Sequence, residues 1–184
     1  MNELPLRVAV RVLRRGGVIA YATESVFGLG CDPFNEVAVA RLLRLKNRPQ
    51  WKGLILIGAN FAQLRPLLKP IEPARQETIT ASWPAPITWV LPVHAWVPTC
   101  VRGHHASLAV RVPAHAQARA LCAAFGGPLI STSANPSGRL PAKTGLRVRQ
   151  YFAEEIDFIL PGKVGGAIRP SEIRDGITGA VIRK

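Results

Sequence analysis

Short apolar runs alternate with amphipathic segments along this chain, and this alternation restricts the fold more than any other feature. Short apolar runs are typical of buried strands, and we expect strands at residues 18–21, 54–57, 87–91, 107–112, 128–130, 158–160 and 180–183. Apolar residues at helical spacing predict helices at residues 5–15, 36–46, 61–68, 72–82, 114–125 and 144–154. Residues 94–105 are expected to form an irregular loop. Strands mixed with helices predict an α/β fold in which helices cover a sheet.

The length and composition favour one folded domain, and we expect a single domain over residues 1–184. Hydrophobic residues make up 48% of the chain, which argues against a disordered protein. No apolar run approaches the length that crosses a bilayer, and the N-terminus lacks a signal-peptide pattern. Cys31, Cys100 and Cys122 are odd in number and widely spaced, which fits reduced thiols. We therefore expect a cytoplasmic protein without membrane association.

The net charge of +13 is the most unusual bulk property. It favours a polyanionic partner, either a nucleic acid or the phosphates of a nucleotide. A solubilising surface in an arginine-rich proteome explains the same charge, so two interpretations stay open. The first predicted helix carries much of this charge on its outer face, at Arg7, Arg11, Arg14 and Arg15.

Several familiar site motifs are excluded by their spacing. Gly28-x-Gly30 follows a strand, but Pro33 stands where a dinucleotide-binding motif has its third glycine. Residues 138–144 end in Lys-Thr like a phosphate-binding loop, but Ala142 replaces the glycine before the lysine. No Gly-x-Ser-x-Gly motif of a serine hydrolase is present. No protein-held metal is expected, because zinc-site spacing is missing from the four histidines, His94, His104, His105 and His115.

The stretch 129–137 reads Leu-Ile-Ser-Thr-Ser-Ala-Asn-Pro-Ser. We expect its strand to end at residue 130, because the hydroxyl and amide side chains that follow favour turns. Pro136 has no N–H for a sheet ladder. The result is a rigid polar loop at the carboxyl end of a strand, where open α/β sheets bind ligands. An ordinary Ser/Asn turn explains the same residues.

Lys46 and Arg48 leave the end of a predicted helix within one turn, and Pro49 fixes the exit. A lysine point charge beside an arginine fork suits a phosphate. The plainer interpretation is that both cations complement the helix dipole.

Arg111 ends an apolar strand, so its guanidinium is expected at a sheet edge or cleft with a carboxylate or phosphate partner. Ser107 lies on the same side of that strand by alternation. The hydroxyls of Thr23 and Ser25 also follow a strand end. Local hydrogen bonding is the alternative in each case.

From Arg11 to Arg183 the order of these elements resembles the YrdC/TsaC family, the threonylcarbamoyl-AMP synthases. The most specific matches are Lys-x-Arg at residues 46–48 and Ser-x-Asn at residues 133–135. Further matches are Tyr-Ala-Thr-Glu-Ser-Val-Phe-Gly-Leu-Gly from residue 21, Trp-Pro-x-Pro from 83, Ser-Leu-Ala-Val-Arg-Val-Pro from 107 and Pro-Ser-Glu-Ile-Arg-Asp from 170. Ala22 stands where the family usually has proline, which we expect to loosen the Thr23 turn. The chain resembles the short, single-domain form of the family.

The resemblance implies a YrdC-like fold, a twisted open mixed sheet flanked by helices, with a basic concave face. It implies condensation of L-threonine, bicarbonate and ATP into threonylcarbamoyl-adenylate, with release of pyrophosphate and with Mg²⁺ bound through ATP. Other proteins then use the adenylate to modify tRNA. By resemblance, L-threonine is positioned by Thr23, Arg111, Ser131 and Ser171. ATP is bound by Lys46, Arg48, Ser107, Ser133, Asn135 and Arg183, with Lys46 and Arg48 as the catalytic pair.

Two other functions stay open. Some members of the family bind double-stranded RNA, so the chain could be an RNA-binding or ribosome-associated module without adenylation activity, in contact with tRNA or another RNA. A carbamoyl-phosphate-handling hydrolase domain is a weaker possibility. Thr23, Ser131 and Arg111 favour the enzyme, because RNA binding does not require a pocket for an amino acid.

Overall fold

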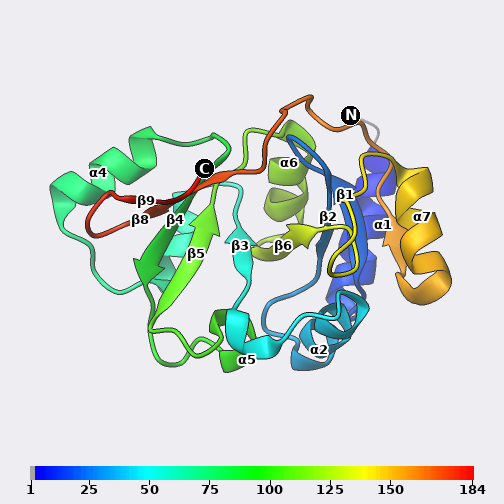
Figure 1. Cartoon of the computed structure of the whole chain (residues 1–184), viewed down its shortest axis with the longest axis horizontal. Helices are drawn as coiled ribbons and strands as arrows, with labels where there is room; N and C mark the ends of the chain where they lie inside the picture. The colour runs from blue at the N-terminus through cyan, green and yellow to red at the C-terminus, as the bar shows by residue number, and fades with distance from the viewer. Residues whose placement is uncertain (1–2) are drawn as a thin grey trace.

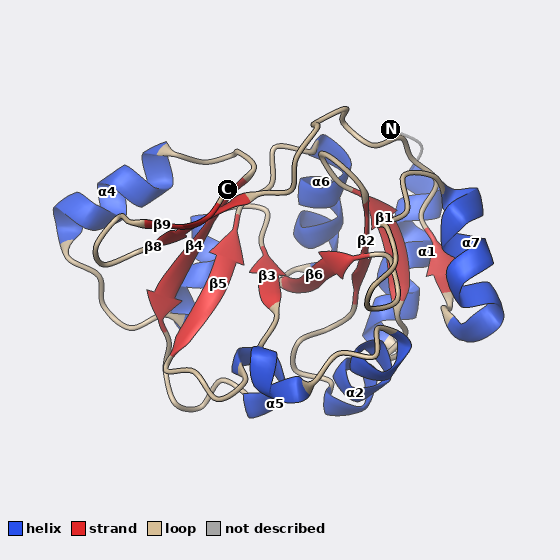
Figure 2. Cartoon of the chain, in the orientation of Figure 1, coloured by secondary structure: helices blue, strands red, loops and turns tan. Residues whose placement is uncertain are grey.

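A computed structural model describes residues 3–184 and contains one nine-stranded sheet with helices packed against it (Figures 1 and 2). The strands are β1 Ile19–Ala22, β2 Phe27–Gly30, β3 Ile55–Ile57, β4 Ile87–Pro92, β5 Ser107–Arg111, β6 Leu129–Ser133, β7 Phe158–Ile159, β8 Glu172–Asp175 and β9 Val181–Arg183. The α-helices are α1 Glu3–Arg14, α2 Glu36–Leu45, α3 Phe61–Leu64, α4 Pro73–Ala81, α5 Thr99–Arg102, α6 Ala116–Phe125 and α7 Gly145–Phe152. Three 3₁₀ helices are η1 Gln50–Lys52, η2 Arg65–Leu67 and η3 Ala153–Glu155.

The strands follow the spatial order β7-β1-β2-β6-β3-β5-β4-β8-β9, with parallel and antiparallel neighbours. The strands at the two ends of this order, β7 and β9, do not pair with each other, so the sheet is open. Strand β6 lies in the middle and is antiparallel to both β2 and β3. The predicted α/β class, with an open mixed sheet flanked by helices, is confirmed.

Alternating side chains divide the core between the two faces of the sheet. Along β1, Ile19 and Tyr21 join a cluster with α1 and α6, whereas Ala20 and Ala22 join the larger cluster with α2, α5 and α7. Leu129 of β6 belongs to the cluster with α1 and α6. Because Ser131 and Ser133 alternate with Leu129, their side chains face the same side of the sheet.

The predicted end of the central strand at residue 130 was wrong. Strand β6 continues through Ser133, because Ser131 pairs with Ile55 on one side and Ser133 pairs with Gly28 on the other. The sequence-based expectation was that the hydroxyl side chains would bond to these backbone groups and favour a turn. Instead, the backbone groups form hydrogen bonds with the two neighbouring strands.

Other differences from the expected elements are local. Pro66 lies at the start of a 3₁₀ turn, so the predicted helix 61–68 divides into α3 and η2. The loop predicted at 94–105 contains the short helix α5. Strands β2 and β8 were not predicted; β8 pairs in parallel with β4, far away in the sequence. All three cysteines are free. Within residues 3–184, no helix has the length and apolarity that a membrane span requires.

Candidate active site

A cavity of about 250 Å³ opens on the sheet face that also carries α1 and α6. Strands β2, β3, β5, β6 and β9 all contribute residues to it. Seven of the ten residues expected at the site line this cavity, namely Thr23, Arg48, Arg111, Ser131, Ser133, Ser171 and Arg183. The sheet thus brings together residues that lie far apart in the chain.

The floor of the cavity is formed where β2 and β6 run side by side. Ser131 and Ser133 face it from β6, and Gly28 lies opposite Ser133. A Cβ atom on Gly28 would lie 3.4 Å from both Ser131 Oγ and Thr23 Cγ2. A larger residue there would therefore fill the floor between these two hydroxyl side chains.

Thr23 is held in a tight turn between β1 and β2. Its backbone N–H and its hydroxyl both donate to the carbonyl oxygen of Val26, at 3.1 and 2.7 Å. Ala22, at the end of β1, pairs with Phe27. The turn is therefore closed by hydrogen bonds that do not depend on a proline before Thr23.

The turn after α2 positions Lys46 and Arg48. Asn47 adopts a left-handed conformation with φ of 48°. The N–H of Arg48 donates to Leu43 O at 2.9 Å, and that of Asn47 donates to Arg44 O at 2.9 Å. This pair of bonds is the Schellman arrangement that ends helices. It reverses the direction of the chain, so that the side chains of Lys46 and Arg48 both extend from the turn that ends α2.

Lys46 is 6% exposed and joins α2 to the end of β6. Its Nζ donates to the carbonyl oxygens of Ser133, at 2.5 Å, and Asn135, at 2.8 Å. Burial, and secondly the neighbouring charge of Arg48, lower the pKa of Lys46 to about 8. Lys46 is absent from the residues that line the cavity, and its Nζ holds the end of β6 that borders the cavity.

Arg48 lines the cavity directly. Its Nε and Nη2 donate to the carbonyl oxygen of Gly53, at 3.2 and 2.8 Å. One carbonyl oxygen uses only part of the donor capacity of a guanidinium. Arg48 is thus fixed in orientation and retains donors for an anion.

Arg111 forms a buried pair with Glu24, a residue that the sequence did not single out as a site residue. The Arg111 Nη1 and Glu24 Oε2 atoms lie 3.4 Å apart, and both side chains are about 10% exposed. The other oxygen, Glu24 Oε1, accepts from the N–H of Ala114 at 2.7 Å. Within residues 3–184, Arg111 Nε is buried without a hydrogen-bond partner. A ligand carboxylate would supply the missing acceptor.

The segment between β7 and β8 completes the wall of the cavity. Figure 1 shows it, orange to red, crossing from the α7 side to the β8–β9 side. The N–H groups of Gly165 and Ala167 donate to the carbonyl oxygens of Thr23 and Glu24, at 3.0 and 2.9 Å. These bonds fasten the segment beside the Thr23 turn.

Ser171 and Arg183 join this wall to the C-terminal strands. The Ser171 hydroxyl accepts from Thr88 Oγ1 at 2.9 Å, and its carbonyl oxygen accepts from Arg183 Nη2 at 2.9 Å. Burial first, and the charge of Arg111 second, lower the pKa of Arg183. Two arginines from different strands therefore bring positive charge to the same cavity.

Three expected site residues, Lys46, Ser107 and Asn135, do not line the cavity. Ser107 faces the same side as Arg111, but four residues of strand separate the two by about 13 Å. The Asn135 amide nitrogen donates to the carbonyl oxygens of Pro136 and Arg139, at 3.0 and 2.7 Å. Its Oδ1 is buried without a partner in the described part of the chain. Asn135 therefore shapes the turn after β6.

The site is strongly cationic. Arg48, Arg111 and Arg183 line the cavity and Lys46 lies behind it, whereas the Glu24 carboxylate is already engaged. Such a surface binds anions. Across residues 3–184, no group of three or more His, Cys, Asp or Glu side chains could hold a metal ion. The arginine donors that line the cavity suit phosphates and carboxylates.

The chain is similar to known proteins over almost its whole length. The family described as "Telomere recombination" (Sua5/YciO/YrdC) matches residues 11–184. A threonylcarbamoyl-AMP synthase of Halorhodospira halophila is 54% identical over 191 residues, which cover 100% of both chains. Another from Pseudomonas aeruginosa is 54% identical over 183 residues, covering 100% of this chain and 98% of the other.

A solved structure extends the likeness to the fold. The crystal structure of P. abyssi Sua5 complexed with L-threonine superposes with a TM-score of 0.89 and 34% identity. The match covers 95% of this chain and 52% of Sua5, so the chain spans about half the length of that protein.

Proposed function

The chain belongs to the Sua5/YciO/YrdC family, and we propose that it is an enzyme that makes threonylcarbamoyl-adenylate from L-threonine, bicarbonate and ATP. The observation that carries the proposal is the cavity in which the Arg111 fork and the Arg48 cation lie beside the hydroxyls of Thr23, Ser131 and Ser133. The end of the cavity at Arg111 suits an amino acid, and the end at Arg48 suits phosphates.

We assign the threonine end to Arg111, Thr23, Ser131 and Ser171. The unpartnered Nε of Arg111 supports a fork that binds the carboxylate of L-threonine. Short hydroxyl side chains suit the hydroxyl of the substrate. Glu24 holds Arg111 from behind and is therefore a positioning residue.

We assign the phosphate end to Arg48, Ser133 and Arg183, with Lys46 and Asn135 setting the position of the β6 end. Ser107 lies farther along β5, and a role for it in ATP binding stays a prediction. The family uses ATP, so a divalent cation accompanies the reaction. We propose Mg²⁺ carried by the phosphates of ATP, where it neutralises their charge.

The reaction needs positioning more than a strong base. The amine of L-threonine attacks the carbon of bicarbonate, and loss of water leaves a carbamate. A carbamate oxygen then attacks the α-phosphorus of ATP, and the bond from that phosphorus to the bridging oxygen breaks to release pyrophosphate. Arg48 and Arg183 can stabilise the charge that shifts onto the phosphate oxygens, because their guanidinium groups already line the cavity.

The product is an activated threonylcarbamoyl group for the modification of tRNA. We propose that other proteins take up the adenylate and transfer the group to tRNA. The unbroken sheet from β7 to β9 supports a single YrdC-like domain over residues 1–184. That the protein acts in the cytoplasm stays a prediction.

The decisive experiment measures pyrophosphate release from ATP with and without L-threonine and bicarbonate. Release is expected only when both are present. L-serine should be a poor substrate rather than an inert one, because a pocket that packs one extra methyl group discriminates by roughly ten- to two-hundredfold. Pyrophosphate release at the same rate without L-threonine, or at equal rates with unrelated amino acids, would contradict the proposed function.

The pKa of Lys46 gives a second test. Protonated Lys46 contributes positive charge beside the phosphate end, and its pKa is about 8 instead of 10.5. We expect ATP affinity, measured without L-threonine, to fall as the pH rises through about 8. The same inflection should be missing in Lys46→Met.

The free energy of unfolding should rise with pH over the range in which ATP affinity falls. The folded chain gives up the Lys46 proton at about pH 8, whereas the unfolded chain keeps it until about 10.5, so unfolding takes up a proton between these values. The free energy of unfolding contributed by Lys46 therefore rises with pH in this range. In the binding experiment, an ATP affinity that stays constant through pH 8 would show that the charge of Lys46 does not contribute to ATP binding.

A further inference from the structure

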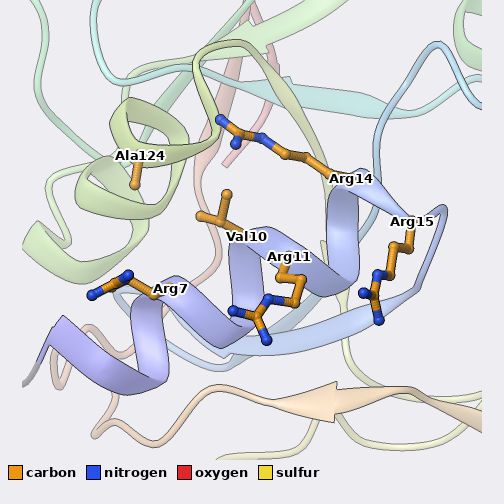
Figure 3. A pocket seen from close by; sticks show the side chains of 6 residues that line it. All are labelled: Arg7, Val10, Arg11, Arg14, Arg15 and Ala124. Atoms are coloured by element: carbon orange, nitrogen blue, oxygen red, sulfur yellow. The ribbon is translucent and has the colours of Figure 1, made fainter.

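Thr88, near the start of β4, is a polar residue that is completely buried, with an exposed fraction of 0%. Exposed polar groups form hydrogen bonds with water. Figure 3 shows such groups on α1, where four exposed arginines line a separate hollow, namely Arg7, Arg11, Arg14 and Arg15. Water does not reach Thr88, so its hydroxyl requires a partner within the protein.

The sheet places Thr88 beside Arg111, on the face that carries the active-site cavity. Trp89, the next residue of β4, packs in the larger core cluster on the opposite face, so the side chain of Thr88 points to the cavity side. Trp89 pairs with Val110 of the antiparallel strand β5, so Thr88 and Arg111 are the next residues to lie opposite each other. Side chains of opposite residues lie on the same face of a sheet. On its other edge, Thr88 pairs with Ile173 of β8.

The partner of Thr88 is the hydroxyl of Ser171, which comes just before β8. Within residues 3–184, the one hydrogen bond of the Thr88 side chain joins its Oγ1 to Ser171 Oγ, at 2.9 Å. If Ser171 donated the proton of this bond, the proton of Thr88 would be buried without an acceptor, which is unfavourable. Ser171 lines the cavity, where a ligand can supply an acceptor. Thr88 is therefore the donor, and Ser171 is the acceptor.

This direction of donation determines what the Ser171 hydroxyl offers to a ligand. A hydroxyl group carries one proton, and the proton of Ser171 is not used in the bond with Thr88. It is free to be donated to an acceptor in the cavity. The backbone of Ser171 is also fixed, because its carbonyl oxygen accepts from Arg183 Nη2 at 2.9 Å. Ser171 thus presents a hydrogen-bond donor from a held position.

The acceptor that suits this donor is a carboxylate oxygen. Thr88 joins Ser171 to the part of the sheet that holds Arg111, and both Ser171 and Arg111 line the cavity. The buried Nε of Arg111 also lacks an acceptor in the described part of the chain. A carboxylate has two oxygens and accepts several hydrogen bonds, so it can accept from both residues.

We propose that Thr88 is a positioning residue for L-threonine. By donating to Ser171, it directs the Ser171 hydroxyl to donate to the substrate carboxylate that Arg111 binds. The identity of the substrate rests on the proposed function. Thr88 is absent from the residues that line the cavity, so it acts through Ser171 and does not contact the substrate itself.

The test separates the hydroxyl of Thr88 from its shape in variants of the full chain. Thr88→Val keeps the shape and removes the hydroxyl, whereas Thr88→Ser and Thr88→Ala form a second pair that differs only by the hydroxyl. Ser171→Ala and Thr88→Val/Ser171→Ala complete a double-mutant cycle. The matched control is Thr78→Val, which removes a threonine hydroxyl from the exposed side of α4. Calorimetric titration gives the Kd of L-threonine in the presence of a non-hydrolysable ATP analogue, and the Kd of the analogue alone.

Thr88→Val should raise the Kd of L-threonine by roughly 2- to 12-fold, the range that one hydrogen bond contributes. Thr88→Ser should bind L-threonine more tightly than Thr88→Ala by a similar factor. Thr78→Val should bind L-threonine like the parent chain, and every Thr88 variant should keep the parent's Kd for the ATP analogue. In the Ser171→Ala background, Thr88→Val should cause no further rise, because the residue through which Thr88 acts is already lost.

Equal Kd values for L-threonine in the parent and Thr88→Val, or in Thr88→Ser and Thr88→Ala, would overturn the role of Thr88. So would additive effects of Thr88→Val and Ser171→Ala, because they would show that Thr88 does not act through Ser171. The parent's pyrophosphate release tests the proposed function separately. If the variants change the Kd of L-threonine as expected but the parent releases no pyrophosphate, the proposed reaction fails and the positioning role stands.

Discussion

Arg111→Gln is expected to lower kcat/KM for L-threonine by roughly 100-fold or more, while ATP affinity stays close to that of the parent chain. The guanidinium is buried, and its Nε has no partner in the described part of the chain, so its hydrogen-bonding capacity is available to a carboxylate. Truncating a buried charged hydrogen-bonding partner costs about 2–5 kcal/mol. Steady-state kinetics with L-threonine as the varied substrate measure the change in kcat/KM. Titration with ATP in the absence of L-threonine measures the ATP affinity.

Loss of Arg111 also leaves the Glu24 carboxylate buried without its counter-charge, which is itself destabilising. The variant Glu24→Gln/Arg111→Gln replaces the ion pair by two neutral amides and serves as the control. It should recover most of any loss in thermal midpoint and none of the loss in kcat/KM. If the double variant recovers both, Arg111 is a structural partner of Glu24 and does not bind L-threonine.

Lys46→Met should reduce the rate of pyrophosphate release by roughly 100-fold or more. Methionine removes the positive charge behind the phosphate end and frees the carbonyl oxygens of Ser133 and Asn135, which Nζ holds at 2.5 and 2.8 Å. Each buried carbonyl left without a donor costs about 1–3 kcal/mol. The removal of a buried amine offsets part of that cost, so the thermal midpoint should change much less than the rate.

The matched control is Lys143→Met, which removes the same charge from an exposed lysine. Its pyrophosphate release should equal that of the parent chain. The charge of Lys46 also predicts that Lys46→Met loses the inflection of ATP affinity near pH 8. A Lys46→Met variant with normal release and a lowered midpoint would make the contact with β6 purely structural.

The sequence was sufficient for features that depend on local patterns. The amphipathic periods predicted most of the helices, and the Lys-x-Arg spacing at the end of α2 predicted two cations leaving one turn. The Schellman bonds of Asn47 and Arg48 give the physical basis for that turn. Burial of Arg111 at the end of an apolar strand also followed from the pattern.

Features that depend on distant pairing could not be predicted. The hydroxyl-rich residues after Ile130 become strand only because β2 and β3 lie on either side of them. Strand β8 exists because β4 pairs with it. Glu24 looked like part of a turn, and its role depends on Arg111 and Ala114, about ninety residues later. The sequence also did not predict that the Nζ of Lys46 donates to the carbonyl oxygens of Ser133, at the end of β6, and Asn135; its expected contact with an anion stays a prediction.

The two sides of the cavity differ in how tightly the chain holds them. Ser131 and Ser133 stand on a strand that is hydrogen-bonded on both edges, so their amides can exchange with deuterium only when a large cooperative unit opens. The segment that carries Gly165 and Ala167 is largely exposed and is held by separate hydrogen bonds to the Thr23 turn, His115 and Gln117, so its amides should exchange sooner. Hydrogen exchange should therefore distinguish the two walls, with the amides of β6 protected for longer than those of residues 163–167.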